Sequence, residues 1–302
     1  MKSSRRFALI IPSLLLLWLA LPPAAAQTIT VTDDLGRQVE LATVPLRIIS
    51  LAPSHSETVC AIASCDLLVG VDTNTDFPAE LDDLPRVGNA FTPDIEAMVA
   101  LDPDLVLADE YSGVHEALER VGVTVYAGTP QTVAETLAYF TTMGTLLGAE
   151  EQAAALVANL EAEFARFGEY LTGSRSPSVF VELDPTPYSA GPESFIGELV
   201  TMAGGSNIVT ADMGDFPQVS PEFVVAGDPD VILLTDAPYG ETAAGVAARP
   251  GWSGLTAVTQ GRVLELSSQQ VNLLSRPGPR LAEAVWELIG LLHPEFLPPE
   301  RP

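Results

Sequence analysis

The chain has 302 residues, of which 47% are hydrophobic, and it carries a formal net charge of −26. The apolar content excludes an acidic disordered chain. The negative charge excludes nucleic acid as a partner, because it repels phosphate backbones. The length is more than a single core usually organises, so it predicts two lobes.

The N-terminus has the pattern of a secretory signal peptide. Three basic residues lie within the first six positions, an apolar run covers residues 7–21, and three alanines end at Ala26. This order predicts a signal peptide over residues 1–26 that is removed after Ala26. The alternative is an uncleaved membrane anchor, but the run is shorter than the ~20 residues that a spanning helix needs. We therefore expect the mature protein in the periplasm or at the cell exterior.

Short β-branched runs then alternate with helical patterns, which is typical of a parallel sheet covered by helices. In the first half we expect strands at 29–32, 39–41, 47–51, 67–71, 105–108 and 123–126, and helices starting at Pro53 and spanning 93–101, 114–120 and 131–147. Ser54 and Glu57 have the spacing of a capping box at the start of the first of these helices.

One long amphipathic pattern follows at 149–171, and then the alternation resumes. In the second half we expect strands at 178–183, 231–234 and 262–266, and helices at 195–203, 221–226 and 279–292. The predicted fold is α/β: two Rossmann-like lobes with mainly parallel central sheets, joined by a single long rigid helix, with a ligand cleft between the lobes. The predicted divisions are an N-terminal lobe over 27–148, a linking helix over 149–172 and a C-terminal lobe over 173–302.

An internal repeat supports two related lobes. Residues 88–107 align with residues 214–233 at one offset and without a gap, so that the Gly, Glu and Asp-Pro-Asp positions coincide. Each copy reads as a short helix, a turn containing proline and a buried strand. Such turns also recur by chance in α/β proteins, but the single offset favours pseudo-symmetry.

Two cysteines, Cys60 and Cys65, lie near the end of the predicted helix that starts at Pro53. Export would allow a disulfide. Five positions along a regular helix are too far apart for a bridge, whereas a turn after Ala63 would shorten the distance. The sequence leaves both states open.

Three motifs follow one another along the chain. They are Arg47-Ile48-Ile49-Ser50-Leu51-Ala52-Pro53-Ser54-His55-Ser56-Glu57-Thr58, then Leu101-Asp102-Pro103-Asp104-Leu105-Val106, and then Ser275-Arg276-Pro277-Gly278-Pro279-Arg280. As an ordered set they resemble the class III periplasmic binding proteins of ABC importers, which carry vitamin B12, ferric siderophores or haem. The likeness extends over about residues 28–293 and is closest to the vitamin B12-binding proteins.

The resemblance implies partners as well as a fold. Members of this family dock onto an ABC permease, which works with its ATPase, through one acidic residue on each lobe. Glu96 and Glu222 occupy those positions by motif, and they are also partners in the repeat. Paired carboxylates on two lobes would bind transporter arginines and set the orientation of docking. The resemblance further implies a monomer.

Loops that follow strands face the cleft in such folds. The ligand-binding candidates on these loops are His55, Asn74, Phe91, Tyr111, Tyr188, Phe216, Tyr239, Asn272 and Arg276. The recurring aromatic side chains favour a bulky, partly apolar ligand over a bare ion.

A corrinoid is the preferred ligand, and haem or a ferric siderophore of the same fold is the alternative. We therefore expect no cofactor beyond a ligand that is itself a metal chelate. A zinc- or manganese-binding protein is the alternative of another class, but the chain has only three histidines for such a site. The motifs of hydrolases, metalloproteases and phosphate-binding loops are missing from the sequence, so we expect a protein that is not an enzyme.

Overall fold

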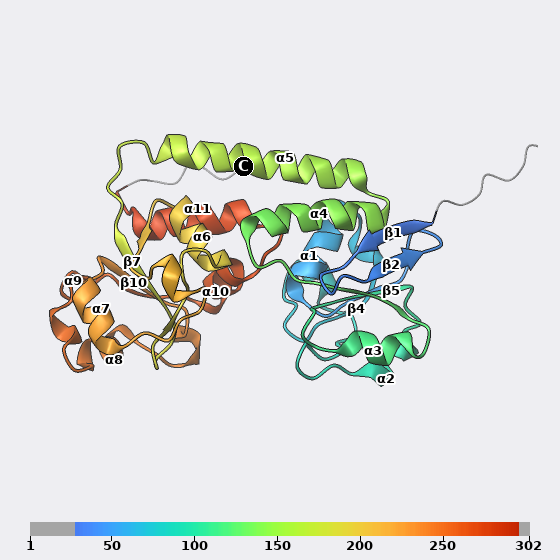
Figure 1. Cartoon of the computed structure of the whole chain (residues 1–302), viewed down its shortest axis with the longest axis horizontal. Helices are drawn as coiled ribbons and strands as arrows, with labels where there is room; N and C mark the ends of the chain where they lie inside the picture. Colours follow the sequence, from blue (N-terminus) through green and yellow to red (C-terminus); the bar gives the residue numbers. More distant parts are fainter. Residues whose placement is uncertain (1–27, 296–302) are drawn as a thin grey trace, which may run out of the picture.

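The computed structural model describes residues 28–295, which form two α/β lobes side by side beneath one long helix (Figure 1). The predicted signal peptide lies outside the described residues. Among residues 28–295, none of the helices is both long and apolar enough to cross a membrane.

The N-terminal lobe is built on a four-stranded parallel sheet. Its strands are arranged in the order β4 (Leu68–Val71), β3 (Ile48–Ser50), β5 (Leu105–Ala108) and β6 (Thr124–Ala127). Strands β3 and β5 are buried along their whole length, as expected for a parallel sheet with helices on both faces. The loops that contain Asn74 and Tyr111 follow the carboxyl ends of β4 and β5.

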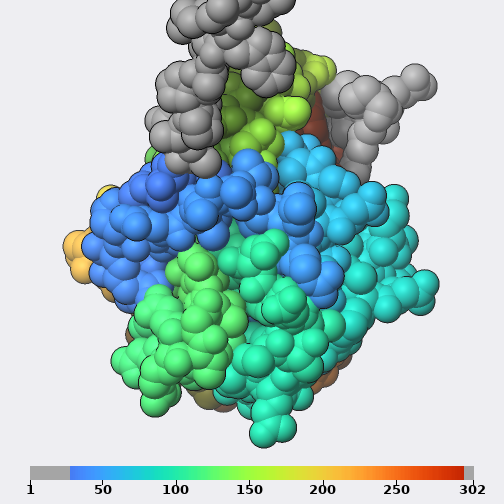
Figure 2. All heavy atoms as spheres, turned by 90° about the vertical axis from the view of Figure 1, so that its right-hand side faces the viewer, coloured from blue at the N-terminus to red at the C-terminus, as the bar shows by residue number. Residues whose placement is uncertain are grey.

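A separate antiparallel hairpin, β1 (Ile29–Thr32) and β2 (Gln38–Leu41), precedes this sheet. Strand β1 packs on helix α4 and strand β2 lies beside β6. Seen end-on, the first residues of the lobe cross its outer face between the linking helix and the α3 region (Figure 2).

The helices of the N-terminal lobe are α1 (Pro53–Ile62), α2 (Ile95–Ala100), α3 (Val114–Glu119) and α4 (Val133–Leu147). The predicted capping box at Ser54 is wrong. Pro53 takes the first helical position, which its fixed φ favours, and Ala52 is the N-cap. Ser54 and Glu57 are therefore buried within the helix, and the Glu57 carboxylate is available for another role.

Helix α5 (Glu150–Tyr170) connects the lobes and packs against α4 of one lobe and α11 of the other (Figure 1). Gly148 ends α4 in a left-handed conformation with φ of 60°, so that the chain turns directly into α5. Contacts at both ends of one continuous helix restrict how far the lobes can separate.

The C-terminal lobe repeats the parallel arrangement and adds one antiparallel strand. Strands β11 (Val263–Glu265), β10 (Val231–Leu234) and β7 (Ser178–Asp184) are parallel, β8 (Tyr188–Ser189) pairs antiparallel with β7, and β9 (Ser206–Asn207) pairs with the start of β7. The helices are α6 (Phe195–Met202), α7 (Pro221–Gly227), α8 (Ala243–Ala248), α9 (Thr256–Thr259), α10 (Ser268–Ser275) and α11 (Leu281–Leu292). Periodicity had not predicted β8, β9, α8, α9 or α10, which are all short.

The repeat is present in three dimensions. Strands β5 and β10 and the starts of α2 and α7 each differ by the same 126 positions. Gly88 and Gly214 both have φ of 86°, while Asp102 and Asp228 are the two non-glycine residues with positive φ in the described chain. Matched backbone conformations at matched positions support pseudo-symmetry between the lobes.

Cys60 and Cys65 form a disulfide. Helix α1 ends at Ile62, and the chain turns through Ala63 into a 3-10 helix at Cys65–Leu67. The turn brings the two Cα atoms to 4.3 Å, which resolves the alternative that the sequence had left open.

Candidate functional site

All five aromatic residues predicted to contact ligand are exposed. Phe91 and Tyr239 are 94% and 88% exposed, and Tyr111, Phe216 and Tyr188 are also largely accessible. Within residues 28–295, the other strongly exposed aromatic side chain is Phe77, which follows β4. Exposed aromatic side chains that gather on loops at strand ends are typical of a binding surface.

The N-terminal lobe presents two of these rings from short, tightly hydrogen-bonded loops. The amides of Phe91 and Thr92 each donate a 2.9 Å hydrogen bond to Oδ1 of Asn89. The amide of Tyr111 donates to Oδ1 of Asp109, directly after β5, at 2.7 Å. Such side-chain-capped turns hold a ring outward without burying it.

The C-terminal lobe presents the other three rings. Tyr188 lies on β8 and bridges to Gln218, and the amide of Ser189 donates to the carbonyl of Pro217, so the segment after Phe216 is held beside β8. Tyr239 ends a 3-10 helix at Ala237–Tyr239 that follows β10. Tyr111 and Tyr239 therefore come shortly after strands β5 and β10, whereas Tyr188 lies within β8 itself.

The side chains of Asn272 and Arg276 bond to residues of the other lobe in this structure. Asn272 lies within α10, and Arg276 is its C-cap residue. The Asn272 amide donates to Asp76 Oδ2 at 2.8 Å, and Arg276 Nη1 donates to Asp76 Oδ1 at 2.5 Å. Arg276 also donates to the carbonyl of Asn74, which is itself an exposed residue of the loop after β4. Both side chains thus join the C-terminal lobe to the N-terminal lobe.

The same contact contains a buried carboxylate that sequence analysis had assigned to a capping box. Glu57 on α1 is 2% exposed and accepts hydrogen bonds from Arg276 at 3.1 Å and from Arg280 at 2.8 and 2.9 Å. The Arg280 guanidinium also lies 4.2 Å from the ring centre of Phe77, which adds a cation–π contact. We call Glu57, Asp76, Arg276 and Arg280 the interlobe cluster. Its partners are separated by about two hundred residues, so no local motif could have revealed it.

A cavity of about 570 Å³ lies beside the interlobe cluster. It is lined by Asp76 and Phe77 from one lobe and by residues of α10 and α11 from the other. Its lining is mainly polar and, apart from Phe77, contains none of the exposed aromatic residues. The cavity therefore belongs to the contact between the lobes.

His55 lies in the core of the N-terminal lobe and not on its surface. Its side chain is fully buried, Nε2 is 3.0 Å from the carbonyl oxygen of Gly128, and the ring stacks on Tyr139 at 5.4 Å. Burial lowers the pKa of His55 to about 4, which keeps the imidazole neutral. This position corrects the expectation of a cleft residue and assigns His55 to packing between α1 and α4.

Glu96 and Glu222 occupy equivalent places in the two lobes. Each is the second residue of its helix, α2 or α7, and each is exposed. Asp94 and Ser220 cap the two helices through side-chain oxygens. A carboxylate in the first turn is favoured by the helix dipole, so both charges are stabilised where they stand.

Two α/β lobes joined by one helix, with exposed aromatic loops at the strand ends, define a two-lobed binding protein. The family of periplasmic binding proteins matches residues 48–270, which is most of the chain, and the chain belongs to this family. It is 32% identical over 278 residues to an uncharacterised ABC transporter substrate-binding lipoprotein of Bacillus subtilis, with 88% of this chain and 86% of the relative covered.

A cobalamin-binding protein of Halobacterium salinarum is 30% identical over 283 residues, covering 89% of this chain and 75% of the relative. A periplasmic haem-binding protein of Pseudomonas aeruginosa has a similar structure, with a TM-score of 0.74, 26% identity and coverage of 85% of this chain and 96% of that one. These relatives are binding proteins by name, which agrees with the expectation of a protein that is not an enzyme.

Proposed function

We propose that this protein binds a bulky metal chelate outside the cytoplasm, preferentially a corrinoid, and delivers it to an ABC permease. The observation that carries the proposal is the set of exposed aromatic rings on loops of both lobes. When exposed rings pack against a flat ligand, their solvent-accessible apolar area is buried. The burial of this area contributes favourable binding free energy. The cobalamin-binding relative from Halobacterium salinarum supports the choice of ligand.

Phe91 and Phe216 are the proposed central contacts, one from each lobe, with Tyr111, Tyr188 and Tyr239 around them and Asn74 at the edge. We assign Asn272 and Arg276 to holding the lobes together, because their side chains bond to Asp76 and Glu57. The ligand is thereby contacted by rings, while ion pairs set the spacing of the lobes.

The test is a titration of the purified protein with cobalamin, followed by absorbance after gel filtration and by thermal shift. A ligand that binds only the folded state raises the melting temperature by mass action. The Phe216→Ala variant should bind about tenfold more weakly, because a buried phenylalanine contributes ~1.5–3 kcal/mol. Val121→Ala is the matched control, since Val121 is an exposed apolar residue at the end of α3, away from the strand-end loops.

Co-elution of cobalamin with the wild type, and its loss in Phe216→Ala alone, would support the proposal. Stabilisation by zinc or manganese in place of any chelate would contradict it.

Haem is the second candidate, and the haem-binding neighbour from Pseudomonas aeruginosa supports it. A tyrosine would be the iron ligand, and Tyr111 and Tyr239 are the most exposed. A hydrogen bond to Glu110, reinforced by its charge, raises the pKa of Tyr111 and disfavours its phenolate, which makes Tyr239 the better candidate. A haemin Soret shift that disappears in Tyr239→Phe, without cobalamin binding, would establish this alternative.

Docking is proposed to depend on Glu96 and Glu222. Alanine at both positions should abolish uptake through the cognate permease while leaving ligand affinity unchanged, because both carboxylates are exposed on helices α2 and α7 and are not among the proposed ligand contacts. Each single variant should give an intermediate loss. Reduced ligand affinity in the double variant would contradict a docking role.

A further inference from the structure

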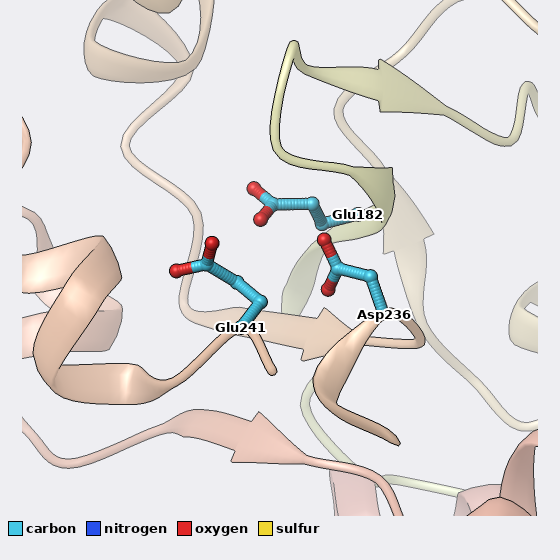
Figure 3. A group of neighbouring side chains, drawn as sticks. All are labelled: Glu182, Asp236 and Glu241. Carbon is cyan, nitrogen blue, oxygen red and sulfur yellow. The ribbon is translucent and has the colours of Figure 1, made fainter. Parts of the chain in front are cut away.

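Three carboxylates meet at the strand ends of the C-terminal lobe. Glu182 comes from β7, Asp236 follows β10, and Glu241 precedes α8, and ligand oxygens of all three lie within 4.8 Å of one another (Figure 3). Within residues 28–295 this is the single group of three or more metal-ligating side chains placed so closely. We call these residues the acidic triad.

Among residues 28–295, one basic side chain is ion-paired with the acidic triad, which is not enough to neutralise it. Arg249 donates to both Glu182 oxygens at 2.6 Å and lies 3.4 Å from Glu241. The Arg249 guanidinium is also fixed over the Trp252 ring at 4.7 Å. Three carboxylates against one guanidinium leave an excess of about two negative charges, which a divalent cation would balance.

Asp236 is the residue that the protein leaves unsatisfied. It is 5% exposed, and neither of its carboxylate oxygens has a hydrogen-bond partner among residues 28–295. Figure 3 shows its carboxylate turned toward that of Glu182. A buried charge without donors is costly, so native proteins seldom keep one unless an ion or a proton compensates it.

The electrostatics agree with this geometry. Burial raises the pKa of Asp236 to about 6, and the neighbouring Glu182 adds to the effect. Burial also raises the pKa of Glu182, although Arg249 opposes the shift. These shifts follow from the burial and the mutual proximity of the carboxylates that the geometry shows.

We propose that Glu182, Asp236 and Glu241 form a binding site for a hard divalent cation of the calcium type. Carboxylate oxygens with water in the remaining positions are the ligands that such ions prefer. Glu182 can keep its two bonds from Arg249 and still coordinate, because each carboxylate oxygen has two lone pairs. The side chain of Glu241 is 19% exposed and opens the site to solvent.

The ion would tie the end of β10 to the start of α8. Between them lies the 3-10 helix that ends at Tyr239, so the bound cation would hold this aromatic loop in place. The site differs from a typical zinc site, since histidine and thiolate ligands take no part in it. It does not depend on which chelate the protein binds.

The test is calorimetric titration of the chelator-treated protein with calcium chloride, with thermal shift as a second readout. High monovalent salt in the buffer screens diffuse binding to the acidic surface. The wild type should bind about one ion saturably, with a Kd on the order of 10⁻⁴–10⁻³ M, as for other extracellular calcium sites. Its melting temperature should rise with added calcium.

Asp236→Asn should weaken calcium binding at least tenfold, because it removes a ligand carboxylate. The variant should fold normally, because the substitution removes an uncompensated buried charge. Glu241→Gln, at the exposed side of the site, should also weaken binding and serves as the second variant. Glu161→Gln on the outer face of α5 is the matched control and should bind as the wild type does. Absence of saturable binding by the wild type, or equal binding by wild type and Asp236→Asn, would overturn the proposal.

Discussion

Each lobe contains a buried glutamate that is paired with arginine, and the two pairs differ in charge balance. Glu57 in the N-terminal lobe pairs with Arg276 and Arg280, and Asp76 pairs with Arg276, so two carboxylates face two guanidinium groups. Glu182 in the C-terminal lobe has Arg249 alone, and Asp236 and Glu241 add two further carboxylates. The interlobe cluster, whose charges balance, joins the lobes. The acidic triad has an excess of negative charge, which is typical of a cation-binding site.

The largest predicted loss of stability comes from breaking the interlobe cluster. Glu57→Gln should lower the free energy of unfolding by about 3 kcal/mol, because it leaves two arginines without their buried partner. Urea unfolding of the purified protein measures this loss. Asp76→Asn is the matched control in the same cluster and should cost less than about 1 kcal/mol, since the Asp76 side chain is half exposed. Equal losses in the two variants would show that burial of Glu57 is not what matters.

The disulfide supports the same helix. Cys60 stands three residues after Glu57 on α1, and its bond to Cys65 fixes the end of that helix. Replacing both cysteines by serine should lower the free energy of unfolding by about 2 kcal/mol, as expected for so short a loop. The C-terminal lobe contains no cysteine, so reduction should weaken the N-terminal lobe first. Hydrogen exchange before and after reduction would detect that order, and uniform loosening of both lobes would contradict it.

The acidic triad predicts a free energy of unfolding that falls as the pH rises. The pKa of Asp236 is about 6 when folded, against an ordinary value of 3.8, so the folded protein binds this proton more tightly than the unfolded chain does. The resulting stabilisation is present below about pH 4 and is lost as the pH rises through 6. Glu182, whose pKa burial also raises, acts in the same direction.

In chelator, Asp236→Asn should therefore raise the melting temperature by a few degrees at pH 7.5 and change it little at pH 4. A thermal-shift series from pH 4 to pH 8 checks this. An equal effect of the substitution at both pH values would contradict the assignment, while calcium should shrink the difference at pH 7.5 if the cation site exists.

The smallest prediction compares two equivalent turns. Asp102 and Asp228 both have positive φ, which costs a non-glycine residue about 1 kcal/mol. Asp228 recovers part of that cost through bonds from the amide and hydroxyl of Thr256. Asp102→Gly should thus stabilise the protein by about 0.5 kcal/mol, whereas Asp228→Gly should be neutral or destabilising. Denaturant midpoints of the two variants measure the difference, and equal shifts would contradict it.

Local patterns were enough to predict most of the fold. The alternation of strands and helices, the long helix and the repeat all depend on residues close in sequence, and the structure has them within a few positions. Short elements such as α10 and β8 were missed because their stability comes from packing and not from periodicity. The exposure of Tyr111 and Tyr239 was also predictable, since both come shortly after predicted strands.

The amino-acid sequence by itself determined the two-lobed α/β plan, the family and the exposed rings, because hydrophobic period and turn residues act over short distances. Only the tertiary structure decided which charged and titratable side chains are buried and which partners they contact. Glu57 meets Arg276 and Arg280 from the other lobe, His55 is buried against Gly128 and Tyr139, and Asp236 comes to lie beside Glu182. The energy of a buried charge depends on partners brought from distant segments, and these partners are set by how the sheets and helices pack.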